Sequence, residues 1–158
     1  MIVVSDTSPI TALITIQQID LLRQLYNEVK IPSAVAEELL AYHTKIPSFI
    51  QAVPVTKIPL LAELNRQLDR GEAEAIVLAK ELHADLLLID EAMGREAARQ
   101  EHLPVIGLMG VLLIAKKKGL VRSLTEIIDR LETEAGFYLS RPQSADSCRR
   151  RRITSTAR

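Results

Sequence analysis

Aromatic residues and cysteine are scarce in this 158-residue chain, and each scarcity argues against a class of protein. Aromatic residues make up 3% of the sequence and tryptophan is absent, which disfavours a platform of rings on which nucleic-acid bases stack. The one cysteine, Cys148, cannot form an internal disulfide, so we expect a reducing, cytoplasmic setting. No apolar run approaches ~18 residues and no Lys or Arg precedes the first one, so we expect neither membrane insertion nor secretion.

An excess of charge of either sign is also absent, but the two signs are unevenly distributed. The formal net charge is zero, yet residues 141–158 hold six Arg and one Asp, which leaves 14 basic and 19 acidic residues in 1–140. An acidic body opposes contact with a nucleic acid on average. The tail has no periodic apolar face, and we expect it to be disordered.

Short apolar runs alternate with helical patterns along residues 1–140, which indicates an α/β domain with parallel strands and crossover helices. Strands are expected at 2–4, 29–31, 86–89 and 105–106. Helices are expected at 9–16, 19–26, 33–43, 60–67, 71–83, 92–101, 109–118 and 123–134. The proline-rich segment 47–59 is expected to be a loop or a short element. Ser8 and Ser33 are candidate N-caps, and Gly119 is a candidate helix stop.

Two aspartates follow strands directly. Asp6 comes within two residues of the first strand, and Asp90 ends the LLLI strand. In an open parallel sheet, ligands bind beyond the carboxyl ends of the strands. We therefore expect these two carboxylates, far apart in sequence, to meet at one edge of the sheet.

Two glutamates are expected to join them from helices. In GEAEAIVLAKELH the apolar face contains Ala75 and Ile76, and Glu72 falls on that face whereas Glu74 points away. In SAVAEELLAY, Glu38 lies at the border of the apolar face, farther inward than Glu37.

Each acid alone has a structural explanation. Asp6 and Asp90 could cap helices, Glu72 could favour a helix N-terminus, and Glu38 could be a solvated charge. Together, carboxylates ~5 Å apart at an effective dielectric of ~20 repel by ~3 kcal/mol per pair. A domain stable by ~5 to 15 kcal/mol needs either protonation or a cation to hold four of them. Oxygen ligands alone suit Mg²⁺ or Mn²⁺.

Four segments match a known pattern: VVSDTSPI, IPSAVAEELL, GEAEAIVLAKELHADLLLIDE and GLMGVLLIAKKKG. On these segments the sequence resembles the PIN-domain superfamily, and within it a prokaryotic subfamily similar to VapC-type toxins of type II toxin-antitoxin pairs. The resemblance covers residues 1–139 and departs from the family pattern in the Arg-rich tail. It implies a three-layer α/β/α domain over 1–140, with a central parallel sheet of four or five strands.

The resemblance also implies a function and a set of residues. It implies a Mg²⁺- or Mn²⁺-dependent endoribonuclease that hydrolyses RNA with metal-activated water and is paired with a small antitoxin protein, as a homodimer. Asp6, Glu38, Glu72 and Asp90 match the acidic ligands. Glu91 corresponds to an outer ligand, and Thr7 or Ser8 to a small hydroxyl residue near the metal.

Basic residues offer candidate contacts to RNA phosphates. Arg95 follows Asp90 on the next helix, and the triplet Lys116, Lys117 and Lys118 ends a later one. For the lysines a solvated helix end is the favoured interpretation, and Arg95 and Arg99 are a similar case. Contacts of this kind give affinity without sequence choice.

Three further interpretations remain open or are disfavoured. The main alternative is a catalytically inactive PIN-like protein that acts by binding a protein partner, and the intact acids argue against it. Dinucleotide binding is disfavoured because SDTSP contains no glycine for the first turn, and a serine-hydrolase nucleophile is disfavoured because no G-x-S-x-G occurs.

Overall fold

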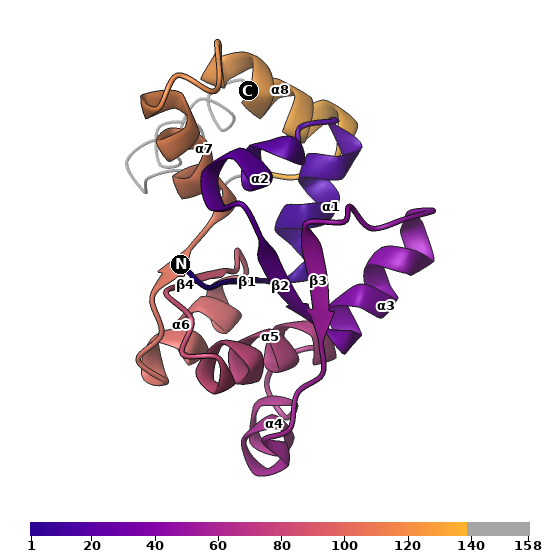
Figure 1. The fold of residues 1–158 in the computed structure, drawn as a ribbon, viewed down its shortest axis with the longest axis vertical. Coiled ribbons are helices and arrows are strands. Elements are labelled where there is room, and N and C mark those ends of the chain that lie inside the picture. The colour runs from indigo at the N-terminus through magenta and orange to yellow at the C-terminus, as the bar shows by residue number, and fades with distance from the viewer. Residues whose placement is uncertain (139–158) are drawn as a thin grey trace, which may run out of the picture.

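A five-stranded, fully parallel sheet forms the centre of the protein in the computed structural model, which describes residues 1–138 (Figure 1). Its strand order is β3-β2-β1-β4-β5. The strands are β1 (Val3–Ser5), β2 (Val29–Pro32), β3 (Ile50–Val53), β4 (Leu86–Leu88) and β5 (Val105–Ile106). Register is fixed in the middle by Val4 of β1, which pairs with Lys30 of β2 and Leu87 of β4.

Helices cover both faces of the sheet and complete a three-layer α/β/α arrangement (Figure 1). Within residues 1–138 they are α1 (Thr7–Thr15), α2 (Asp20–Tyr26), α3 (Ser33–Tyr42), α4 (Ile58–Leu64), α5 (Arg70–Glu81), α6 (Ala92–Gln100), α7 (Leu108–Lys117) and α8 (Leu124–Glu134). The predicted fold class, with its parallel sheet of four or five strands, is confirmed. No helix in this part of the chain combines the length and apolarity that crossing a membrane requires.

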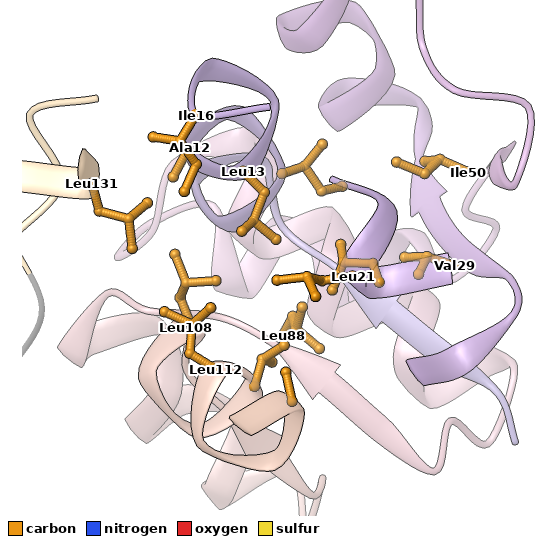
Figure 2. Close-up of a cluster of buried hydrophobic side chains, with 14 of the residues drawn as sticks. Ala12, Leu13, Ile16, Leu21, Val29, Ile50, Leu88, Leu108, Leu112 and Leu131 are labelled. Carbon is orange, nitrogen blue, oxygen red and sulfur yellow. The ribbon is translucent and has the colours of Figure 1, made fainter. Parts of the chain in front are cut away.

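Successive side chains of a strand point to opposite faces of the sheet, so the strands contribute residues to two separate hydrophobic cores. Val3 faces one core and its neighbour Val4 faces the other. Figure 2 shows the first core, where Leu13 of α1 and Leu108 of α7 lie close to Leu88 of β4. This core fixes α1 and α7 over the same face of the sheet, and both helices begin at its carboxyl edge.

The second core is built around α5, which contacts α3, α4 and α6 as well as the sheet. Every residue from Gly71 to Ala79 is buried. A helix that is enclosed all round has no solvent face. The prediction that Glu74 points outward is therefore wrong, because it assumed one apolar stripe: this side chain is 5% exposed.

Other sequence expectations need smaller corrections. β3 lies in the proline-rich segment expected to be a loop or short element, and its exposed Gln51 and Ala52 break the apolar pattern of a buried strand. α1 begins at Thr7, so Ser8 is not an N-cap, and the N-cap position of α3 is Pro32 and not Ser33. Gly119 has φ +75° directly after α7, as a helix stop requires. The tail expected to be disordered, 141–158, lies outside the described residues.

Candidate functional site

The order of the strands places a crevice between β1 and β4. The chain runs outward from β1 through β2 to β3 in one direction and from β4 to β5 in the other. Such a reversal is where open α/β sheets bind their ligands. Asp6 follows β1, and its backbone N–H donates to the carbonyl of Leu88 at the end of β4 over 3.0 Å.

Asp6 lies at the N-cap position of α1, but its side chain makes no capping hydrogen bond. It is 4% exposed. Its pKa is raised from 3.8 to about 7, mainly by burial and also by the negative charges of Glu72, Asp69 and Glu38, while the backbone N–H of Thr7 lowers it. Capping therefore does not explain why a carboxylate is buried here.

Glu72 lies in the first turn of α5 and is 6% exposed, so the prediction that it points inward is confirmed. Burial is the main cause that raises its pKa from 4.5 to about 7, and the charges of Asp69, Glu91 and Glu38 act in the same direction. The backbone N–H of Asp69 donates a hydrogen bond to the Glu72 carboxylate and lowers the pKa in part. Among the described residues, the side-chain charges that act on this carboxylate are all negative.

Glu38 approaches the pair from α3, and Gly71 makes the approach possible. A Cβ atom at Gly71 would lie 2.9 Å from Oε1 of Glu38 and 3.3 Å from Oδ1 of Asp6. The absence of a side chain thus lets two carboxylates from different elements lie against the same backbone. The Thr7 hydroxyl donates to Oε2 of Glu38 and orients it.

Asp90 lies at the same edge but has different partners. Its Oδ1 accepts the backbone N–H of Leu108, in the first turn of α7, over 3.0 Å, while its Oδ2 is enclosed without a partner in residues 1–138. Burial raises its pKa, the Leu108 N–H and the positive charge of Arg95 lower it, and Glu91 raises it. Asp90 therefore caps α7 from a distance, because the N-cap residue Gly107 has no side chain to do so.

A cavity of about 430 Å³ opens beside these acids. Its lining contains Ser8, Asp90, Glu91 and Ala92 together with the segment Gly136–Tyr138 after α8. Glu91 is exposed at the N-cap position of α6. The cavity brings the predicted residues Ser8, Asp90 and Glu91 together.

The basic candidates separate into two groups. Arg95 is half-buried on α6 and faces Asp90 across Gly107, with its Nη1 3.8 Å from the position a Cβ would take there. Lys116, Lys117 and Lys118 are exposed at the opposite end of α7 from Leu108, which a ten-residue helix puts about 15 Å away. The structure brings Arg95, and not the lysines, to the acidic edge.

Sequence reasoning missed three residues that shape this edge. Asp69 caps α5 by accepting the Glu72 backbone N–H over 2.9 Å, and its charge raises the pKa of both buried acids. Gly71 admits Glu38 and Asp6. Glu74 accepts the backbone N–H of Ala34 over 2.8 Å and so joins α5 to α3. The D-x-G-E spacing at 69–72, an N-cap followed three residues later by Glu, was a signal available for Asp69.

The donor set fits a hard divalent cation better than it fits any other metal. The converging side chains of Asp6, Glu38 and Glu72 offer only carboxylate oxygens, the ligands that Mg²⁺ and Mn²⁺ prefer. The buried Asp6 and Glu72 carboxyls also have no nearby side-chain cation that lowers their raised pKa values. In the described part of the chain no three Asp, Glu, His or Cys side chains form a ready-made metal group, so binding would require side chains to turn toward one another.

The fold and the acidic edge together define a class: a parallel α/β domain with carboxylates at the switch point of its strands. The chain belongs to the PIN-domain family, since the family model DUF3368, described as a PIN domain, matches residues 2–151. PIN domains are generally nucleases, which act on nucleic acids and generally use divalent metals. No curated protein matches the chain.

Proposed function

We propose that this protein is a Mg²⁺- or Mn²⁺-dependent endoribonuclease. One observation carries the proposal: Asp6 and Glu72 are buried near Glu38 and Asp69, under negative charges that nothing in residues 1–138 neutralises. An arrangement that opposes stability is expected where a cation belongs. Membership of the PIN family supports a nuclease.

Different side chains would bind the cation and the RNA substrate. Asp6, Glu38 and Glu72 would hold a divalent cation, with Asp90 and Glu91, which follow β4, completing the set. When bound, such a cation supplies Lewis-acid activation of water and stabilises the charge that develops at phosphorus and on the leaving oxygen. Thr7 orients Glu38, and Ser8 lines the cavity where the RNA chain would pass.

Arg95 is the better candidate for a contact to an RNA phosphate. It lies beside Asp90, is only half-buried, and lines a pocket together with Asp90. A guanidinium that keeps unused donors can bind a phosphate oxygen. The lysines at 116–118 are too remote for the scissile phosphate and would contact only more distant nucleotides.

We also propose the finer assignment to VapC-like toxins, on the resemblance of the SDTSP, GEAEAI and LLIDE segments. This assignment implies a cytoplasmic protein, a cognate small antitoxin partner and a homodimer. A small antitoxin reading frame next to the gene, whose product forms a complex with this chain and suppresses its activity, would support it.

Cleavage of RNA by the purified protein tests the enzymatic proposal. We expect cleavage with Mg²⁺ or Mn²⁺ and none with EDTA, and we expect Asp6→Asn to lower the rate on the order of 10³-fold. Glu63→Gln on α4 is the matched control, because Glu63 is exposed. Equal cleavage by the parent and Asp6→Asn would identify a contaminating nuclease. No cleavage by a folded parent chain would favour the alternative of an inactive, partner-binding PIN protein.

A further inference from the structure

The segment that follows α8 brings an aromatic side chain to the acidic edge. The chain has five aromatic residues, and two of them, Phe137 and Tyr138, are adjacent in this segment. Together with Gly136 they line the cavity that contains Asp90 and Glu91. A chain whose composition disfavours a stacking platform therefore still places aromatic residues where the proposed substrate passes.

The local backbone fixes which of the two rings faces outward. Gly136 has φ +60°, a conformation that favours glycine and that turns the chain at the end of α8. The backbone N–H of Phe137 then donates to the carbonyl of Leu131 over 2.8 Å, and the Phe137 ring packs on the first core. The next side chain, Tyr138, is 77% exposed. Phe137 anchors the segment, and Tyr138 is presented to solvent at the cavity.

The charge of the cavity indicates which part of a nucleic acid can approach the ring. The lining that Tyr138 shares also contains Asp90 and Glu91, which repel phosphates, so a phosphate is not the group that enters beside them without a cation. A nucleobase is uncharged, and every base has a face that stacks on an aromatic ring. The amino groups of a base can also donate to a carboxylate.

We infer that Tyr138 stacks on an unpaired base of the RNA, next to the phosphate held at the acidic edge. The inference rests on the proposed ribonuclease function and requires the bound nucleotide to be unpaired, because a base must leave its helix to stack on a protein ring. Stacking of this kind tolerates different bases and contributes affinity more than sequence choice.

Binding of a short, fluorescently labelled single-stranded RNA to the full chain in EDTA tests the inference without cleavage. We expect Tyr138→Ala to weaken binding about tenfold, Tyr138→Phe to retain it, and Tyr42→Ala to leave it unchanged. Tyr42 is the matched control, since it is 81% exposed at the end of α3. A duplex of the same sequence should show no difference between the parent and Tyr138→Ala.

An RNA scanned with abasic nucleotides gives the discriminating result. If Tyr138 stacks on a base, one abasic position should weaken binding to the parent but not weaken binding to Tyr138→Ala any further. Equal affinity of the parent and Tyr138→Ala, or failure of the parent to bind single-stranded RNA both in EDTA and with Mg²⁺, would overturn the inference.

Cleavage kinetics separate this inference from the proposed function. With active protein and metal, Tyr138→Ala should raise KM about tenfold and change kcat less than threefold, because the ring contacts the base and not the reacting phosphate. Unaltered KM would refute stacking and leave the nuclease proposal standing. Binding that depends on Tyr138, in a chain that cleaves nothing, would support the stacking site and refute the nuclease.

Discussion

Glu72 and Glu74 lie two residues apart in α5 and are both buried, but their surroundings are opposite. Glu74 accepts the backbone N–H of Ala34 over 2.8 Å, and Arg70 lies 3.4 Å from its other oxygen. Glu72 is surrounded by Asp69, Glu91 and Glu38, and its pKa is raised to about 7. One carboxylate joins two helices, and the other is held in a place that opposes its charge.

This difference shows that burial alone does not identify a functional carboxylate. In residues 1–138, several acids accept backbone N–H groups in the first turn of a helix, among them Asp69 for α5, Glu74 for α3 and Asp90 for α7. Asp6 occupies the N-cap position of α1 without a capping hydrogen bond, and among the described residues only the N–H of the adjacent Thr7 lowers the pKa of its carboxylate. Asp6 and Glu72 each accept one backbone N–H as well, but their pKa values remain raised to about 7, so a cation is the plausible further partner of these two carboxylates.

Substituting Glu72 and Glu74 one at a time separates the proposed catalytic role from the structural role, and it gives the largest expected effect on activity. Glu72→Gln should lower kcat/KM for RNA on the order of 10³-fold and raise the metal-free melting temperature, because it removes a buried negative charge. Glu74→Ala should lower the melting temperature by roughly 3 to 8 °C, since it leaves the Ala34 N–H without an acceptor. Its kcat, measured well below the transition, should remain within about threefold of the parent. The opposite pattern would mean that Glu74 is the ligand.

The sequence predicts the layers of this fold better than it predicts the environment of single acids. Strand-end Asp6 and Asp90 could be placed because the carboxyl ends of parallel strands share one edge. Glu74 could not be placed, because helical periodicity assumes a solvent face that α5 does not have. The capping of α7 by Asp90 could not be predicted from local sequence either, because Leu108 lies 18 residues farther along the chain.

The pH dependence of stability should further distinguish the environment of Glu72 from that of Glu74. In the metal-free protein the pKa of Glu72 is raised from 4.5 to about 7, so between these values the folded chain binds more protons at this site than the unfolded chain. The stability that Glu72 contributes is complete below about pH 4.5 and is lost as the pH rises through about 7. The melting temperature of Glu72→Gln relative to the parent should therefore increase by about 8 °C from pH 4.5 to pH 8. A constant difference would show that the Glu72 carboxyl titrates as it does in water.

A divalent cation should relieve the repulsion around Glu72 and leave the surroundings of Glu74 unchanged. Of the three predictions, this one has the smallest expected effect. At ten times its dissociation constant, Mg²⁺ or Mn²⁺ stabilises the folded chain by about 1.4 kcal/mol, or roughly 4 °C in melting temperature. The gain should be greater at pH 8 than at pH 5, because protons compete with the metal for Asp6 and Glu72 below their raised pKa of about 7. It should be retained by Glu74→Ala, which keeps the acidic edge, and lost by Glu72→Gln. Differential scanning fluorimetry with metal and with EDTA measures all of these differences, and equal gains in the two variants would place the cation away from Glu72.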